Sequence, residues 1–593
     1  MPKVPSRKFK GEWVKKYPWV QKSEGLSEYA YCTYCKKTIE PKLSTLASHG
    51  TSKSHLSNAP NNPKNQTSIP FPVIKHSKKD KQIKKAEIRL AVSVACHTAI
   101  KSVDHIAEIV KSEGTGSVWE NTKLHRTKCG KIISKVVAKS LKSALKASIE
   151  GRGYSILIDE STDVSSSKLL CICIRYFNSE LNKVVDEYLD TVEVLGTKGE
   201  ELFNHIMEVL TAWNLDVNNM VGFGSDGANN VSGKLNSVWS RIKASNPSVI
   251  QIKCTCHSLD LCVAQAFDAM PSSVGYLLQE IPNHFNKSSL RRDAYTTLFS
   301  VMHPSGDYSV PSPFTKFSQT LWLVRGKVLY NLKVNWEELK AYFMCALENA
   351  GSDVRYKLRT ILQELNNERN LMYVIFLVPV IQEFERVNSK FHTSGEVDGP
   401  IQDLVLLHKV LKARIFETNG HRLKLENIDF GYCLDDALHK SKLDERQVHE
   451  VKVMCMSFLI KLSHEVEKRL PDNENIFKDL KKLTPLAVLS ESKPPFRALP
   501  FQKFLTLNGR DIEKLETQYR LIDQIPWSDI LQPMPSEMAQ FWSGVRSYKR
   551  NGDLMFTELA AYALSCLSIP ISTAVVERVF SQVLSLRINR EID

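Results

Sequence analysis

The chain has 593 residues, which is more than one hydrophobic core usually supports, so several domains are expected. Its hydrophobic share of 42% and its charged share of 24% are typical of a folded, soluble protein. The formal net charge of +14 favours a polyanionic partner such as DNA or RNA, although a basic solvated surface explains the charge alone equally well.

Cysteine usage and hydropathy argue against two further classes of protein. The 13 cysteines are scattered and no apolar stretch follows the N-terminal residues, so a secreted disulfide framework is not expected and the compartment is predicted to be reducing. The longest apolar run, residues 373–381, is broken by Pro379 and falls short of the roughly 18 residues of a membrane span. No membrane partner is therefore expected.

The first 22 residues mix cations with aromatic side chains. Trp13, Tyr17 and Trp19 stand among lysines, a composition suited to contacting phosphates and stacking on bases. Alternatively, the aromatic side chains form the small core of the module that follows. The cations assigned to DNA binding are Lys8, Lys10, Lys15 and Lys16.

Four residues with zinc-ligand side chains come next. Cys32, Cys35, His49 and His55 have the spacing C-x2-C-x13-H-x5-H, which is within the range of a Cys₂His₂ zinc site. So small a module needs its metal to fold. Two unrelated residue pairs in a polar segment are the alternative, but four ligands at compatible spacing favour a Zn²⁺ finger over residues 1–60.

A linker and a helical segment are expected after the finger. Residues 61–83 are predicted to be a basic linker, because an Asn-, Pro- and Ser-rich stretch precedes a lysine cluster there. The cluster fits a nuclear-import signal, a DNA-contacting arm or the solvated start of a helix. Apolar residues at helical spacing in 84–111 and 132–148 predict a helical connector over 84–150.

Strand signals begin at Ser155. Three strand-like runs, a helix over residues 199–213, a short strand at 220–223, another helix and a strand at 249–253 follow in order. The order β-β-β-α-β-α-β is that of the ribonuclease H-like fold, in which the first and fourth strands are neighbours at the centre of the sheet. We therefore expect the first part of such a core, with α/β architecture, over residues 151–258.

Three acids could meet in this core. Asp159 ends the first strand, Asp226 follows the fourth, and Glu577 lies near the C-terminus on a helix that Ser572 and Thr573 could cap. Together they could hold two Mg²⁺ ions roughly 3.5–4 Å apart, the arrangement used in phosphoryl transfer. For each acid taken alone, a helix cap, a turn former or a solvated carboxylate is the better interpretation.

Two other motifs in this region do not support a nucleotide site. Residues 222–227 match G-x-G-x-x-G, but the acid expected about 20 residues later is missing and Asp226 would occupy the pyrophosphate position. The run from Gly227 to Gly233 also fails the P-loop spacing. Cys254 and His257 could belong to a second zinc site, but without a partner pair at suitable spacing structural packing is favoured.

Residues 259–554 are predicted to be almost entirely helical, with helices over 328–349, 357–367, 404–417 and 448–470. No fixed repeat is present. Because this region stands between the fifth strand and the helix of Glu577, it is predicted to be a large all-helical insertion into the catalytic fold.

Five motifs together resemble the hAT transposase superfamily, especially members with a BED-like zinc finger. They are ILIDESTD at 156–163, GFGSDGANN at 222–230, C-x-x-H at 254–257, LWLVRGKVL at 321–329 and LSIPISTAVVERVFS at 567–581. The resemblance implies a catalytic triad of Asp159, Asp226 and Glu577, with Cys254 and His257 supporting the active site. It also implies that Trp322 lies beside a flipped base and that residues 555–593 hold the final core helix and a dimerisation segment.

Two functions follow from these expectations. The first is a DNA-cutting and joining enzyme in which the finger grips DNA and the triad binds Mg²⁺. The second is a domesticated transposase, a nuclear DNA-binding and dimerising protein without catalysis. The intact acids favour the first function. Leu321, which stands where the family usually has Arg, and the chain end at Asp593 favour the second.

Overall fold

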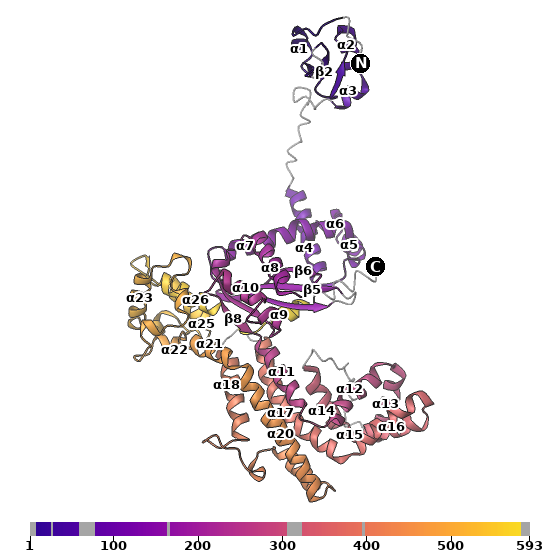
Figure 1. Ribbon diagram of the computed structural model, residues 1–593, viewed down its shortest axis with the longest axis vertical. Coiled ribbons are helices and arrows are strands. Elements are labelled where there is room, and N and C mark those ends of the chain that lie inside the picture. Colours follow the sequence, from indigo (N-terminus) through magenta and orange to yellow (C-terminus); the bar gives the residue numbers. More distant parts are fainter. Residues whose placement is uncertain are drawn as a thin grey trace. The chain divides into compact units, whose positions relative to one another are not determined.

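The computed structural model describes residues 7–24, 28–58, 78–162, 167–304, 323–393, 398–580 and 582 (Figure 1). The chain divides into two compact units, Met1–Ala138 and Lys139–Asp593. Among the described helices, none combines the length and the apolar character needed to cross a membrane.

The first unit begins with a small finger built on a three-stranded antiparallel sheet. Trp13 and Trp19 are buried in its core with Val20 and Leu46, so their rings are not available to stack on bases. The interpretation of these aromatics as a small core is therefore confirmed. The elements of the finger are α1 (Glu12–Lys16), β1 (Val20–Lys22), β2 (Ala30–Cys32), β3 (Lys37–Ile39), α2 (Leu43–Gly50) and α3 (Lys53–Asn58).

Helices make up the rest of the first unit. The single helix expected over residues 84–111 is wrong, because the chain turns at residues 98–101 and forms two helices. Val94 of the first then packs with Val103 of the second in one core. Both helices have the same apolar period, so periodicity could not locate the turn. The elements are α4 (Lys78–His97), α5 (Ser102–Glu113), η1 (Trp119–Asn121), α6 (Arg126–Ile132) and the π-helical turn η2 (Ile133–Val137).

A five-stranded mixed sheet lies at the centre of the second unit. Its strand order is β6-β5-β4-β7-β8, with β4, β5 and β6 antiparallel and with β7 parallel to both β4 and β8. The predicted meander and the predicted adjacency of the first and fourth strands are confirmed. The strands are β4 (Tyr154–Thr162), β5 (Lys168–Asn178), β6 (Lys183–Val194), β7 (Met220–Ser225) and β8 (Ile250–Lys253).

Helices cover both faces of this sheet. On one face, Ile156 and Ile158 of β4 pack in the core that also includes residues of α7, α8 and α10. On the other, Leu157 packs against Val576 and Phe580, in a stretch that is helical from 574 to 580. The flanking helices are α7 (Ala138–Ile149), α8 (Gly199–Trp213), α9 (Asn229–Ser232), α10 (Val238–Ser245), α11 (Thr255–Phe267) and α26 (Thr557–Leu567).

The predicted insertion is helical apart from short 3-10 turns, loops and the hairpin β9–β10. Two expectations within it are corrected. Asn335 interrupts the helix expected over residues 328–349, and Pro379 does not end a helix but lies inside α17. The penalty of an internal proline, about 3 kcal/mol, is outweighed there because its neighbours Phe376, Leu377 and Val380 are buried.

The bounds of the insertion follow the chain in order, without the short 3-10 turns. They are α12 (Ser272–Asn286), α13 (Ser289–Met302), α14 (Leu323–Val334), α15 (Trp336–Glu348), α16 (Ser352–Asn366), α17 (Glu368–Thr393), α18 (Asp398–Ala413), α19 (Tyr432–Lys440), α20 (Glu445–Arg469), α21 (Pro471–Lys481), α22 (Pro485–Val488), α23 (Ile512–Leu521), α24 (Trp527–Ile530), α25 (Met538–Ser547), β9 (Lys549–Arg550) and β10 (Asp553–Leu554).

Candidate functional site

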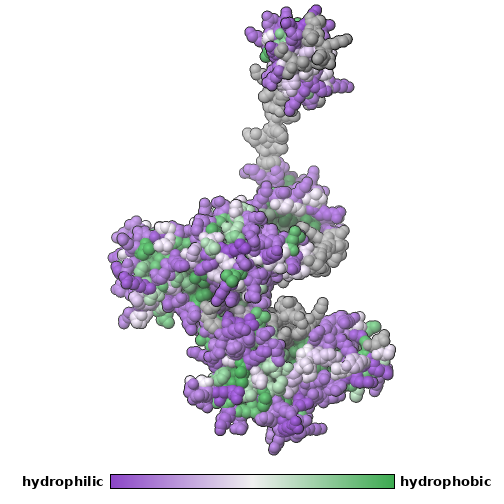
Figure 2. All heavy atoms as spheres, in the orientation of Figure 1, coloured by the Kyte–Doolittle hydropathy of each residue, from purple (hydrophilic) through white to green (hydrophobic). Residues whose placement is uncertain are grey.

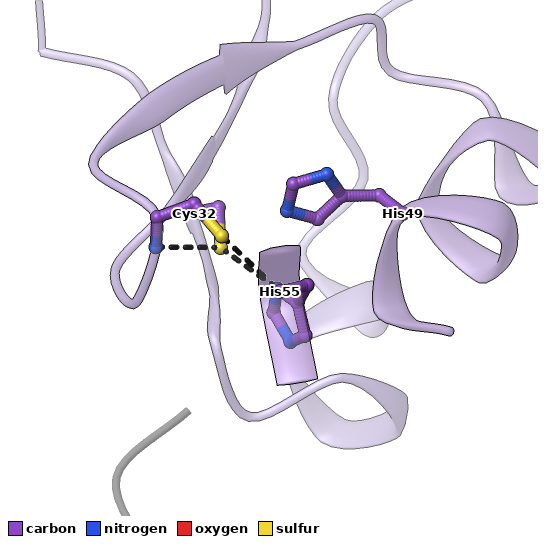
Figure 3. A group of neighbouring side chains, drawn as sticks. Cys32, His49 and His55 are labelled. Carbon is purple, nitrogen blue, oxygen red and sulfur yellow. Dashed lines mark hydrogen bonds between the residues drawn. The ribbon is translucent and has the colours of Figure 1, made fainter. Parts of the chain in front are cut away.

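The four predicted zinc ligands meet inside the finger. Cys32 ends β2, Cys35 follows in the next turn, and His49 and His55 come from α2 and α3 (Figure 3). Their ligand atoms all lie within 4.8 Å of one another. The local fold explains the arrangement, because the turn after β2 lets the Cys35 backbone N–H donate to Cys32 Sγ at 3.4 Å.

The distances in this cluster fit zinc. His55 Nδ1 lies 3.4 Å from Cys32 Sγ and 3.5 Å from Cys35 Sγ. With Zn–S near 2.3 Å and Zn–N near 2.0–2.1 Å, a tetrahedral site holds sulfur and nitrogen about 3.6 Å apart. His49 Nε2 is buried without a hydrogen-bond partner, which is the state of a ligand atom that awaits a metal. Two thiols and two imidazoles are the donor set that zinc prefers.

The cations predicted to contact DNA lie on the surface of the finger. Between residues 7 and 58 the sequence has ten Lys and Arg residues against four Glu residues, and hydrophilic side chains dominate the visible surface of the finger (Figure 2). Lys8 forms a salt bridge with Glu28 at 3.2 Å. The side chains of all four predicted DNA contacts are exposed: Lys8, Lys10, Lys15 and Lys16.

Strand alternation and two glycines direct the three acids to one face of the sheet. Asp159 shares the face of Leu157, which packs against the helical residues 574–580. A Cβ at Gly222 would lie 2.7 Å from Pro570 Cδ, and one at Gly224 would lie 3.1 Å from Pro570 Cγ. The glycines of β7 therefore let the segment before Glu577 lie directly on the strand that leads to Asp226.

Electrostatic effects show that the three carboxyls are close to one another. Burial, followed by the charges of Asp226, Glu577 and Cys254, raises the pKa of Asp159 to about 8. Burial, followed by Cys254, raises the pKa of Glu577 to about 7, against the opposing effect of Arg578. These carboxyls thus lie where a second negative charge is unfavourable and where a cation would relieve the repulsion.

Cys254 and its neighbours hold the C-terminal segment against the core. The Thr573 backbone N–H donates to Cys254 Sγ at 3.4 Å, and Thr255 Oγ1 donates to the Ile571 carbonyl at 2.9 Å. Cys254 is buried, and hydrogen bonding from Cys256 lowers its pKa. His257 is half-buried in the first turn of α11. Within the described residues, these side chains do not complete a second compact metal-ligand group.

The acids also do not form a compact group of the kind found in the finger. A two-ion site distributes its ligands over two centres roughly 3.5–4 Å apart, so its carboxylates stand farther apart than the ligands of a single zinc ion. Trp322 and Leu321 lie outside the described residues, as does Asp163.

Asn230 was missed by the sequence reasoning. Its Nδ2 donates to Glu160 Oε1 at 3.1 Å and to the Thr197 carbonyl at 3.0 Å, which links the end of β4 to the start of α8. Burial, the first cause, raises the pKa of Glu160, and the bond from Asn230 opposes that rise. The available signal was the polar run that follows Asp226, where a side-chain amide can satisfy a buried carboxylate.

Comparison with known proteins finds similarity over part of the chain. Residues 98–237 match the family described as DUF4371, the ZMYM1/FAM200 RNase-like domain. General transcription factor II-I repeat domain-containing protein 2 of Bos taurus is 23% identical over 265 residues, covering 42% of this chain and 25% of that protein. The Mus musculus protein of the same name is 25% identical over 282 residues, covering 45% and 27%.

The chain spans about a quarter of the length of the curated relatives it matches. Asp159 and Asp226 fall inside the segment that matches the RNase-like family, whereas Glu577 falls outside it. Residues 98–237 are therefore similar to an RNase-like domain, which agrees with the mixed sheet at the centre of the second unit.

Proposed function

We propose that the protein is a transposase-derived, DNA-binding protein of the hAT type, in which Asp159, Asp226 and Glu577 form a two-metal site for cutting and joining DNA strands. The raised pKa of Asp159 is the observation that carries the proposal, because Asp226 and Glu577 both contribute to it from distant parts of the chain. Functional sites are where such perturbed carboxyls concentrate.

The side chains fit Mg²⁺ chemically. All three offer hard carboxylate oxygens, which is the donor type that Mg²⁺ takes in phosphoryl-transfer sites. When bound there, the ions would supply charge neutralisation at the attacking and leaving oxygens of the phosphodiester. The three acids would hold the ions, and the contacts of Cys254 and Thr255 would keep the segment before Glu577 on the sheet.

The finger supplies DNA affinity in this proposal. Its exposed lysines provide sequence-independent attraction to phosphates, and Zn²⁺ held by Cys32, Cys35, His49 and His55 keeps the module folded. A nuclear location and homo-oligomer formation through residues 555–593 belong to the same proposal.

A nicking assay with purified full-length protein and supercoiled plasmid DNA tests the catalytic part. We expect cleavage that requires Mg²⁺ or Mn²⁺ and disappears in Asp159→Asn and Glu577→Gln. Asp553→Asn is a matched control, because Asp553 is exposed in the distant hairpin β9–β10. Cleavage that persists in Asp159→Asn would reject the triad.

A DNA-binding protein without catalysis is the second candidate. The name of the matched relatives, which refers to a general transcription factor repeat, favours it, as does Leu321. This candidate predicts no metal-dependent cleavage by the wild type, together with DNA binding that Cys32→Ser abolishes. Retention of full DNA affinity in Cys32→Ser would remove the finger from both candidates.

A further inference from the structure

Three arginines line one cavity at the start of β4. The cavity has a volume of about 90 Å³, and Arg152, Arg510 and Arg546 line it with Gly151, Gly153 and Ser565. A single water needs only about 10–15 Å³ of such volume, so the cavity has room for a group of several heavy atoms. It is remote from the proposed metal site, because Asp159 lies five residues farther along β4 than Tyr154, about 17 Å at the usual rise per residue.

The hydrogen bonds of these arginines all go to neutral oxygens. Arg152 and Arg546 both donate to Ser179 Oγ, and the Nε of Arg152 is buried without any acceptor. Arg510 donates to the carbonyls of residues 504 and 561 and to Ser565 Oγ, the last at 2.6 Å. None of the three forms a salt bridge with a carboxylate in the described part of the chain.

Another buried arginine of the same sheet shows the usual arrangement. Arg175 is paired with Asp186, with Nη1 3.1 Å from Oδ1 and 3.0 Å from Oδ2. At the cavity, by contrast, burial and then repulsion from Arg546 lower the pKa of Arg152. Burial also lowers the pKa of Arg510, although Cys566 and Glu558 partly offset the shift. Converging cations without a counter-charge are unfavourable unless an anion joins them.

Glycines keep the cavity open at the turn into β4. A Cβ at Gly153 would lie 2.8 Å from Ser565 Oγ, so a side chain there would push against the wall of the cavity. Gly151 has a φ of +67°, a conformation that residues with side chains rarely adopt, and no atom lies within 4 Å of its Cβ position. The turn therefore exposes backbone and guanidinium groups to the same space.

We propose that this cavity binds a phosphate group, with Arg152 and Arg546 as its principal ligands and Arg510 fixed behind them. Planar guanidinium groups match the oxygens of a phosphate, and a phosphomonoester carries close to two negative charges at neutral pH, which suits three converging cations better than a single carboxylate does. The phosphate belongs either to a small phosphorylated molecule or to the end of a nucleic-acid strand. The inference does not depend on the proposed catalysis by the acids.

Calorimetric titration of the full chain with inorganic phosphate and with pyrophosphate, at constant ionic strength in chloride buffer, tests the site. We expect saturable binding that weakens by about tenfold or more in Arg152→Gln and in Arg546→Gln, because each loses charge-assisted hydrogen bonds. Arg446→Gln is the matched control, since Arg446 has an 87% exposed side chain and pairs with Glu450 on the surface. It should bind phosphate as the wild type does.

Thermal unfolding without phosphate separates ligand binding from folding. Both variants should melt no lower than the wild type, because each removes a like charge from the cluster. Asp159→Asn should keep its phosphate affinity, so failure of the catalytic proposal leaves this result unaffected. Absence of saturable binding by the wild type, or equal affinity in the wild type and both cavity variants, overturns the inference.

Oligonucleotides distinguish the two sources of phosphate. A short single strand with a 5′-phosphate that displaces inorganic phosphate, when the same strand without it does not, identifies a nucleic-acid end. Failure of both strands to displace bound phosphate identifies a small phosphorylated ligand. Displacement by both strands alike would show binding elsewhere on the polyanion and would count against a terminal-phosphate site.

Discussion

Asp159 concentrates the conflict between burial and charge in this protein. Five buried residues, 154–158, precede it in β4, so its carboxyl is drawn out of water by the strand that delivers it. Its pKa of about 8 means that the metal-free protein holds a proton there at neutral pH. A cation that binds must replace this proton, so metal affinity should rise with pH.

The pH dependence of stability follows with a defined sign. The pKa of Asp159 is raised in the folded state from 3.8 to about 8, so its contribution to stability is complete below about pH 4 and is lost as pH rises through 8. Asp159→Asn should therefore gain stability over the wild type at pH 8, on the order of 2 kcal/mol after allowance for partial solvent screening. At pH 4 the two proteins should differ little.

Urea unfolding of both proteins at pH 4, 6 and 8 without divalent metal measures this difference. A gap between them that does not widen with pH would contradict the raised pKa. Addition of Mg²⁺ at pH 8 should stabilise the wild type and leave Asp159→Asn unchanged.

The positions of the acids at strand ends could be predicted from sequence, whereas their surroundings could not. The apolar run before Asp159 and the short strand before Asp226 reveal themselves by composition. By contrast, the arginine cavity unites the turn at 151–153 with Arg510 and Arg546, and no local pattern relates positions so far apart. The burial of Trp13 and Trp19 likewise depends on packing that the sequence left open between two interpretations.

Among the elements, the finger depends most on a single bound ion. Its core contains few residues, and structural zinc sites contribute roughly 10–16 kcal/mol in comparable modules. We expect one zinc per chain in metal analysis of the purified protein, and loss of that zinc in Cys32→Ser. Cys96→Ser is the control, because Cys96 is an exposed thiol on α4. Equal zinc content in Cys32→Ser and the wild type would rule out the proposed ligand set.

Strand β7 depends on the absence of side chains. A Cβ at Gly222 would meet Ser155 Oγ at 2.5 Å and Pro570 Cδ at 2.7 Å, so Gly222→Ala should lower the unfolding free energy by about 1–3 kcal/mol. It should also displace the segment that positions Glu577. Gly275→Ala provides the comparison, since no atom lies within 4 Å of that Cβ position in α12. Chemical denaturation of the two variants should separate them, and equal stability would argue against the close approach.

Helix and strand identity followed well from periodicity, whereas turns between elements of the same kind did not. The bounds predicted for α8 agree with the structure, because a single apolar face continues over residues 199–213. The turn at 98–101 and the interruption at Asn335 join helices whose patterns run on across the break. Pro379 misled in the other direction, since tertiary packing keeps α17 helical around it.

At the scale of the molecule, the net charge of +14 should make DNA binding strongly dependent on salt. Each phosphate contact that is lost reduces the slope of log K against log salt by about 0.9. Replacing Lys8, Lys10, Lys15 and Lys16 together by Gln should therefore lower the magnitude of the slope by up to about 3–4. Fluorescence anisotropy with a labelled duplex over a range of salt concentrations measures it.

A matched quadruple variant on the helical insertion is the control for this experiment. Its lysines are exposed and lie in surface salt bridges, so their loss should change the slope less: Lys412, Lys440, Lys468 and Lys478. An equal reduction by both sets would indicate that DNA binding reflects total charge and not the finger.

The order of strands was the largest feature that the sequence could predict, because alternation and helix spacing identify each element in turn. The division of the chain at residue 138 was not expected, since α7 was assigned to a connector. In the structure Ile149 of α7 packs in the core on one face of the sheet. Long-range packing of this kind depends on contacts that no short window contains.

The helical insertion also sets the timetable on which the proposed centre is assembled at the ribosome. Glu577 is translated roughly 350 residues after Asp226, which takes about 20–70 s at the usual elongation rates. Throughout that interval the strip of β7 that Pro570 later covers stays open on the nascent chain. A premature stop anywhere in the insertion would leave two of the three acids without the third, so unfinished chains should be unable to damage the genome.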